Sequence, residues 1–138
     1  MKYFFALAFL LPFSLFAQRS TGRFQNDTLY TSSGFKIYKG QTLQFGKGTG
    51  KDGKFRYVNI KNEVSTASLT NNSIVVKKMK NFGISVLGNG YIEIIGKITF
   101  KDGSKGYIDI HMAFDKVLEE YAGTPSELIA PAEFKKSL

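Results

Sequence analysis

The sequence contains no cysteine, and this absence excludes several kinds of protein. A disulfide-stapled fold and thiolate chemistry both require thiols. A lipoprotein needs a cysteine after its leader to carry the acyl chains, so we expect a protein that is not lipid-anchored. Histidine occurs once, at His111, which excludes sites built from several imidazoles. The sequence therefore predicts no metal site and no cofactor.

Long apolar runs are also missing, except at the N-terminus. Lys2 follows the initial methionine, residues 4–16 are almost entirely apolar, and Ala17 offers a small residue for signal peptidase. This layout is typical of a secretory signal peptide, and the apolar run is too short to span a bilayer. We therefore predict a signal peptide over residues 1–17 and an exported protein, periplasmic or secreted, that begins at Gln18. Export argues against cytosolic metabolism, ATP-driven chemistry and genome reading.

Acidic residues are few relative to basic ones. The chain holds 19 Lys and Arg against 11 Asp and Glu, for a net charge of +8. The predicted signal peptide contains one base and no acid, so the mature protein carries +7. Outside the cytoplasm, such a protein meets anionic lipid headgroups, acidic glycans, phosphorylated wall polymers and acidic proteins. The alternative is that the charge serves only solubility, because the lysines are spread along the chain.

Alternation of apolar and polar residues is the main pattern in the rest of the chain, and it predicts strands. Residues 18–33 are polar and predict a flexible N-terminal arm, ending in a short strand, before a single domain over residues 34–138. At Phe114 the apolar spacing becomes that of one short helix, which runs to Tyr121. These elements predict a mainly β fold: a small antiparallel barrel, OB-like or SH3-like, of about six strands with one short C-terminal helix. A small β-sandwich is the alternative.

Residues 91–112 give the clearest strand signal. They predict a β-hairpin whose turn holds a glycine in the left-handed conformation. The predicted register places Ile94 opposite Ile110 on an apolar face. On the other face, it places Glu93 opposite His111.

Two parts of the sequence resemble each other. Residues 40–60 can be laid on residues 90–110 without gaps, and nine of the twenty-one positions are identical, including a Lys-Asp-Gly run in each. One interpretation is a duplicated strand–turn–strand unit that presents two lysine-bearing loops. The other is that two hairpins use the same favourable turn residues.

The segment Gly48–Gly53 matches the pattern G-x-G-x-x-G. A dinucleotide site needs a helix after this loop, whereas a strand is predicted from Phe55, so the match is accidental. A better functional interpretation is an anion-binding loop, in which Lys47, Lys51 and Lys54 add charge to exposed backbone amides. A flexible hairpin tip is the simpler alternative.

His111 is the one candidate for acid–base or nucleophilic catalysis. A hydrolase would use it with Asp109, but nothing in the sequence singles out a nucleophile. Glu93, Asp109 and Asp115 would supply paired carboxylates if the fold brought them together. The simpler interpretation is a contact between His111 and Glu93 across the sheet. We therefore predict that the protein is not an enzyme.

Three runs carry a resemblance to short exported proteins of Gram-negative bacteria that have no known activity. They are TSSGFKIYKGQTLQFGKGTGKDGKFRYV at residues 31–58, KKMKNFG at 77–83 and YIDIHMAFDK at 107–116. The resemblance covers most of the mature chain and implies a small exported β domain. It transfers no functional residue, because the shared residues belong to turns and strands.

Together these observations predict a non-enzymatic binding module of the cell envelope. Its partner is an anionic envelope component or another envelope protein, contacted through basic hairpin loops. The predicted contact residues are Lys47, Lys51, Lys54, Arg56, Lys97, Lys101 and Lys105. One alternative is a carrier of a small apolar ligand inside the barrel, and another is a cryptic hydrolase that uses His111. Basic and aromatic residues also suit single-stranded nucleic acid, but export argues against that partner.

Overall fold

The computed structural model describes residues 22–63, 66–81, 90–100, 102–120, 123–134 and 136–137. The predicted signal peptide over residues 1–17 lies outside them. The strands are β1 (Arg23–Gln25), β2 (Thr28–Tyr30), β3 (Lys36–Tyr38), β4 (Thr42–Phe45), β5 (Val58–Ile60), β6 (Ser73–Asn81), β7 (Tyr91–Thr99), β8 (Lys105–Ala113), β9 (Glu119–Glu120), β10 (Leu128–Ile129) and β11 (Lys136–Ser137). Short 3₁₀ turns are η1 (Lys51–Gly53), η2 (Ala67–Leu69), η3 (Lys116–Leu118) and η4 (Ala132–Phe134).

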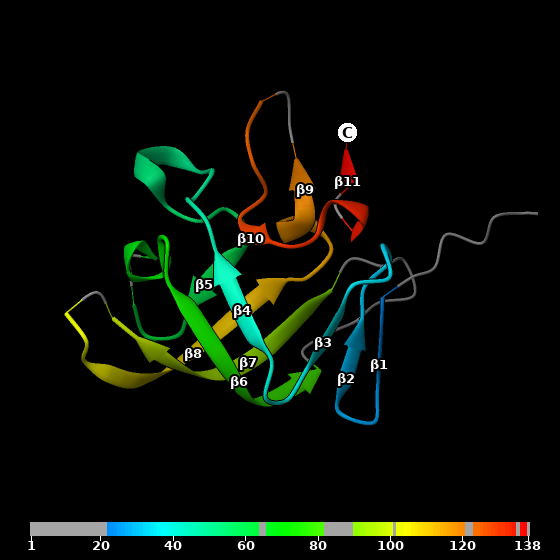
Figure 1. Cartoon of the computed structure of the whole chain (residues 1–138), viewed down its shortest axis with the longest axis horizontal. Helices are drawn as coiled ribbons and strands as arrows, with labels where there is room; N and C mark the ends of the chain where they lie inside the picture. The colour runs from blue at the N-terminus through cyan, green and yellow to red at the C-terminus, as the bar shows by residue number, and fades with distance from the viewer. Residues whose placement is uncertain are drawn as a thin grey trace, which may run out of the picture.

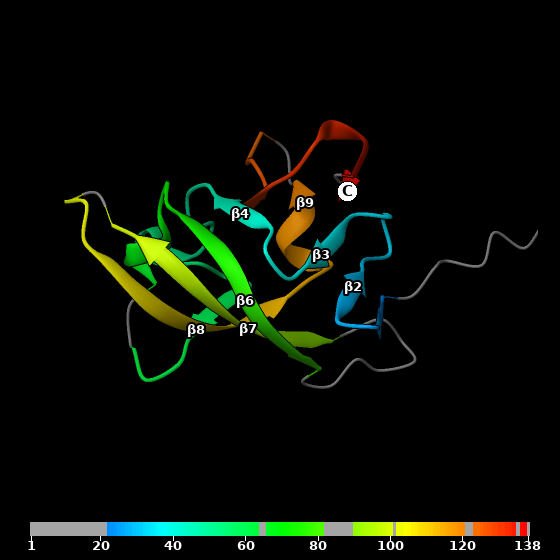
Figure 2. The ribbon, with the colours of Figure 1, turned by 60° about the horizontal axis from the view of Figure 1, so that its bottom comes forward.

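The fold is mainly β, as predicted. Six antiparallel strands form the main sheet in the order β10-β4-β6-β7-β8-β5, and β1, β2 and β3 form a second sheet. The main sheet curls into a half-barrel, so that β4 lies above β7 and β8 in the view of Figure 2. Figure 1 shows the three-stranded sheet beside one end of this half-barrel, with β9 and β11 next to it.

The hairpin of β7 and β8 has the predicted register. Ile94 pairs with Ile110, and Glu93 pairs with His111. Ile94 and Ile110 are fully buried in one contiguous apolar cluster on the inner side of the sheet. Because side chains alternate across a strand, the polar partners at 93 and 111 lie on the opposite, outer side.

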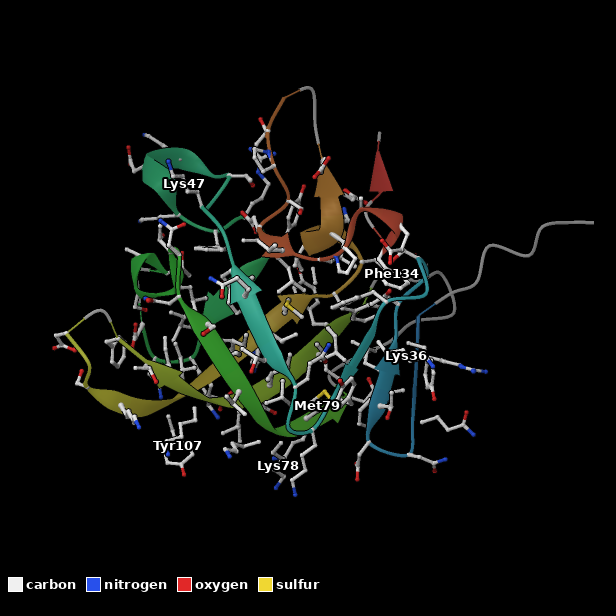
Figure 3. All side chains as sticks on the ribbon, in the orientation of Figure 1. Lys36, Lys47, Lys78, Met79, Tyr107 and Phe134 are labelled. Atoms are coloured by element: carbon white, nitrogen blue, oxygen red, sulfur yellow. The ribbon has the colours of Figure 1, made fainter. Side chains whose placement is uncertain are left out.

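A β-bulge in β6 keeps this alternation in phase. The register against β7 shifts between Val76 and Lys78. Val76 and Met79 are both buried, whereas Lys78 is exposed. Figure 3 shows Met79 toward the core and Lys78 pointing away from the sheet. One extra residue therefore returns β6 to the inward–outward pattern of β7.

A buried carboxylate joins the two edges of the half-barrel. β10 and β5 are the first and last strands of the sheet. Glu127, next to β10, is 1% exposed and accepts hydrogen bonds from the backbone N–H groups of Arg56 (2.6 Å) and Tyr57 (3.0 Å), which precede β5. A side chain thus joins the two edges between which no strand pairing is present in the described residues.

From residue 22 onward, the structure differs from the predicted flexible arm. β1 and β2 form a hairpin around Asn26 and Asp27, both of which have positive φ angles (52° and 54°). This is the conformation of a tight two-residue turn, and Asn and Asp tolerate it. Leu29 in β2 is fully buried and pairs with Ile37 in β3. The short strand predicted at the end of the arm, around residues 28–31, is β2. β1 was not predicted, because a strand of three residues carries too few inward side chains to make a pattern.

The predicted short C-terminal helix is reduced to a single 3₁₀ turn. Phe114, Val117 and Leu118 are fully buried, as their spacing required. The backbone, however, makes only η3 before it extends into β9, which pairs in parallel with β11. The apolar spacing therefore predicted which residues are buried, but it did not predict the backbone conformation. Tyr121, the predicted end of the helix, lies outside the described residues.

The two similar segments of sequence have different structures. β7 and β8 pair with each other, whereas β4 pairs with β6 and β10, and β5 pairs with β8. The Lys-Asp-Gly run forms η1 in the first segment. Of its second occurrence, the described residues Asp102 and Gly103 lie in the β7–β8 hairpin loop. The segments share turn residues such as Gly53 and Gly103, both with positive φ, but they do not form the same unit.

Candidate functional site

Charged and aromatic side chains gather on the convex side of the main sheet, which we call the outer face. Its members alternate with buried residues along β6, β7 and β8, and on or just after β5. They are Asn59, Lys61, Val75, Lys78, Lys80, Tyr91, Glu93, Ile95, Lys97, Thr99, Lys105, Tyr107, Asp109 and His111. In Figure 3, Lys78 and Tyr107 point to the same side of the sheet, away from the core.

An imidazole and two carboxylates lie at the centre of the outer face. Glu93 is directly opposite His111, and Asp109 precedes His111 by two residues on the same strand. One ligand atom from each of the three residues lies within 4.8 Å of the others. Asp115 does not join them, because its carboxylate accepts a hydrogen bond from the backbone of Ser32 at 2.9 Å.

The two oxygens of Asp109 have different surroundings. Oδ2 lies 3.6 Å from Nζ of Lys61 in an ion pair. Oδ1 is buried and has no hydrogen-bond partner among the described residues. An unsatisfied buried oxygen of this kind destabilises the folded state by about 1–3 kcal/mol. Asp109 therefore retains an acceptor oxygen that the described residues leave unused.

Lysines flank the central cluster. Lys80 pairs with Glu93, Lys78 with Ile95, Lys97 with Tyr107, and Lys105 with Thr99. With Lys61, the outer face carries five lysines against two carboxylates, so it is positive. Tyr107 is 73% exposed and Tyr91 is 47% exposed. Exposed tyrosines beside lysines offer flat apolar contact area and charge together.

Part of the glycine-rich loop is already bonded to a carboxylate. Oε1 of Glu127 accepts hydrogen bonds from Thr49, from its backbone N–H at 2.9 Å and its hydroxyl at 2.7 Å. The same oxygen accepts from Arg56, as described above. The loop thus binds a carboxylate of its own chain. The amide of Thr49 is therefore already bonded within the chain, and nothing in the sequence around Glu127 indicated that this carboxylate would be buried.

The predicted contact residues fall into two groups. Lys47, Lys51, Lys54 and Arg56 are exposed on the glycine-rich loop, while Lys97 and Lys105 are exposed on the outer face. Lys101 lies outside the described residues. In Figure 1, the loop around η1 lies well apart from the tip of the β7–β8 hairpin, and Figure 3 shows Lys47 far from Tyr107. The fold therefore does not bring the two groups into one patch.

Three outer-face lysines were not among the predicted contacts: Lys61, Lys78 and Lys80. The alternation of side chains along β6 does not predict the outward position of Lys78, because the bulge that turns it outward has no residue signature in this strand. Lys61 follows β5, whose pairing with β8 joins segments distant in sequence. Long-range pairing of this kind cannot be read from local pattern.

The remaining alternatives are constrained by the same geometry. The inner side of the sheet is lined by the contiguous cluster of buried apolar side chains, so a small apolar ligand would have to displace side chains from it. The central cluster gathers groups that the hydrolase alternative required around His111. Its three members are an imidazole and two carboxylates, which are proton-transfer groups, and none of the three is itself a hydroxyl or thiol nucleophile.

Comparison with models of protein families, with curated proteins and with solved structures finds no match to this chain. Among the described residues, no helix has the length and apolar character that crossing a membrane demands. The residues themselves therefore carry the functional argument.

Proposed function

We propose that this protein is an exported, non-enzymatic binding module that contacts an anionic component of the cell envelope through its outer face. The observation that carries the proposal is the alignment of Lys61, Lys78, Lys80, Lys97 and Lys105 on one sheet face with two exposed tyrosines. The groups recognised would be phosphates or carboxylates on a lipid or a polymer.

Several weak contacts have to act together in such an interaction. One exposed ammonium–anion contact contributes about 1 kcal/mol or less. A sheet holds neighbouring strands about 4.8 Å apart, so the backbone positions of its lysines are already set when they meet a repeating anionic surface. Because these charges are exposed, added salt will screen the interaction.

Export is part of the proposal. It is supported by the signal-peptide layout of residues 1–17 and by the resemblance to small exported proteins. Mass spectrometry of the protein expressed from its full sequence and recovered from a periplasmic extract tests it. We expect the mass of the chain Gln18–Leu138. Recovery of the unprocessed chain, in the cytoplasm only, would contradict it.

The binding experiment compares two variants with equal losses of charge. The outer-face variant changes four exposed lysines to glutamine: Lys78, Lys80, Lys97 and Lys105. The matched loop variant does the same to Lys47, Lys51, Lys54 and Arg56. All eight side chains are exposed, so circular dichroism should show an unchanged fold in both. Retention on isolated envelopes is then measured at low and high salt.

We expect the outer-face variant to lose retention at low salt and the loop variant to keep most of it. Equal losses would mean that net charge alone matters, and full retention by the outer-face variant would refute the proposal. Vesicles containing phosphatidylglycerol and a purified acidic polysaccharide then separate a lipid ligand from a polymer ligand.

A further inference from the structure

We infer that Glu93, Asp109 and His111 form a binding site for a divalent metal ion of the zinc class. This inference goes beyond the proposed function, because it concerns a cation at the centre of the outer face rather than anions at its lysines. It also departs from the prediction, made from the missing cysteines and the single histidine, that the chain has no metal site.

The first argument is geometric. Zinc binds imidazole nitrogen and carboxylate oxygen at about 2.0–2.2 Å, so two ligands of one ion lie at most about 4 Å apart. The three ligand atoms lie within 4.8 Å of one another. Small side-chain rotations therefore suffice to bring them onto one ion. The backbone positions are fixed, because Glu93 and His111 are paired in the middle of the β7–β8 ladder.

The second argument is the unsatisfied oxygen of Asp109. Oδ1 is buried and lacks a hydrogen-bond partner among the described residues, while Oδ2 pairs with Lys61. A cation would satisfy Oδ1 and leave the ion pair in place. Lys61 would then orient the carboxylate from outside the metal's own ligands, as outer-shell partners commonly do.

The chemical types of the three ligands determine which class of metal the site would bind. One imidazole with two carboxylates suits zinc, copper and nickel, whereas magnesium and calcium favour sites made only of oxygen. Three protein ligands leave at least one coordination position for water or another ligand. The neighbouring charges oppose the cation, because Lys80 pairs with Glu93 and Lys61 forms an ion pair with Asp109. Lys78 lies farther away, on the other side of Ile95 from Asp109. We therefore expect a site of moderate affinity.

The test uses the full-length expressed chain without a histidine tag, purified by cation exchange. Isothermal titration with zinc chloride should give one ion per chain, and magnesium chloride should give no binding. Because His111 is the only histidine, a zinc-dependent shift of its imidazole ¹⁵N resonances is assigned without ambiguity. His111→Gln, Glu93→Gln and Asp109→Asn should each weaken zinc binding by about tenfold or more.

Two further variants serve as controls. Glu133→Gln removes an exposed carboxylate on η4 and should leave zinc affinity unchanged. Lys80→Gln removes a positive charge opposite Glu93 and should tighten zinc binding about threefold. Loss of that charge should weaken retention on envelopes, so the two interactions respond in opposite directions.

Absence of zinc binding, or zinc binding that survives His111→Gln and Asp109→Asn, would overturn the inference. Either result would leave the comparison of the outer-face and loop variants unaffected. Circular dichroism of each variant, recorded without metal, separates a lost ligand from a lost fold.

Discussion

Glu127 and Tyr57 lie 70 residues apart in sequence, and the carboxylate of the first accepts a hydrogen bond of 3.0 Å from the backbone N–H of the second. This contact joins the two edge strands of the curled sheet. The carboxylate accepts three further hydrogen bonds, from Thr49 and Arg56. Backbone N–H groups rather than a cation therefore compensate its burial.

Replacing Glu127 should destabilise the protein strongly. Glu127→Ala leaves three backbone N–H groups and a hydroxyl without their acceptor, and we expect a loss of about 3 kcal/mol or more in the free energy of unfolding. Glu127→Gln keeps one oxygen but turns an N–H₂ group toward a backbone donor, so about 1–2 kcal/mol should be lost. Urea unfolding followed by circular dichroism measures both.

The matched control is Glu133→Gln, which changes an exposed carboxylate and should stay within about 0.5 kcal/mol of the parent protein. If Glu127→Ala unfolded at the same urea concentration as this control, the carboxylate would not be the element that joins the sheet edges.

Two glycines should respond differently to alanine for separate physical reasons. A Cβ at Gly48 would lie 2.2 Å from the backbone oxygen of Gly53, which forces the backbone of the loop to move. A Cβ at Gly103 meets nothing within 4 Å, but its φ of +85° is strained for alanine. We expect about 3 kcal/mol or more of destabilisation at Gly48 and about 1 kcal/mol at Gly103. Similar costs at the two positions, measured by thermal unfolding, would contradict the close approach at Gly48.

The β7–β8 hairpin loop contains a carboxyl group whose pKa is changed by its neighbours. The pKa of Asp102 is lowered from 3.8, chiefly by a hydrogen bond from the Ser104 hydroxyl and next by the Ser104 backbone N–H. Both donors favour the ionised form. These hydrogen bonds therefore stabilise the loop at pH values above the ordinary pKa of aspartate. The stabilisation is lost as the pH falls through the lowered pKa.

Ser104→Ala should raise the pKa of Asp102 back toward its ordinary value, because the hydroxyl donor is removed. A titration of the side-chain carboxyl carbon by NMR measures this directly. An unchanged pKa in the variant would show that the hydroxyl does not hold the carboxylate.

The sequence predicted those parts of the fold where many residues repeat one pattern. Nine residues of alternation in each of β7 and β8 fixed both the register and the outward position of Glu93 and His111. Of the two short strands in the N-terminal arm, the sequence predicted the one at its end, which is β2, but not β1. Val117 and Leu118 would be buried both in a helix and in the observed 3₁₀ turn, so their apolar spacing could not distinguish the two conformations.

The candidate site could be predicted only in part. Lys97 and Lys105 belong to the predicted contacts and lie on the outer face, whereas the loop lysines lie elsewhere. The pairing of β5 with β8, which brings Lys61 to Asp109, joins segments about 50 residues apart. Glu127 is buried because three segments distant in sequence meet around it, and no local spacing predicts such a meeting.

The central claim is that the outer face is the surface that meets anionic groups. The most direct measurement is a titration of the ¹⁵N-labelled protein with soluble polyphosphate, followed by amide chemical shifts. We predict that the largest changes fall on β6, β7 and β8, around Lys78, Lys97 and Tyr107, and that they fade as salt is added. Changes confined to the glycine-rich loop around Lys51, or spread evenly over the surface, would contradict the claim.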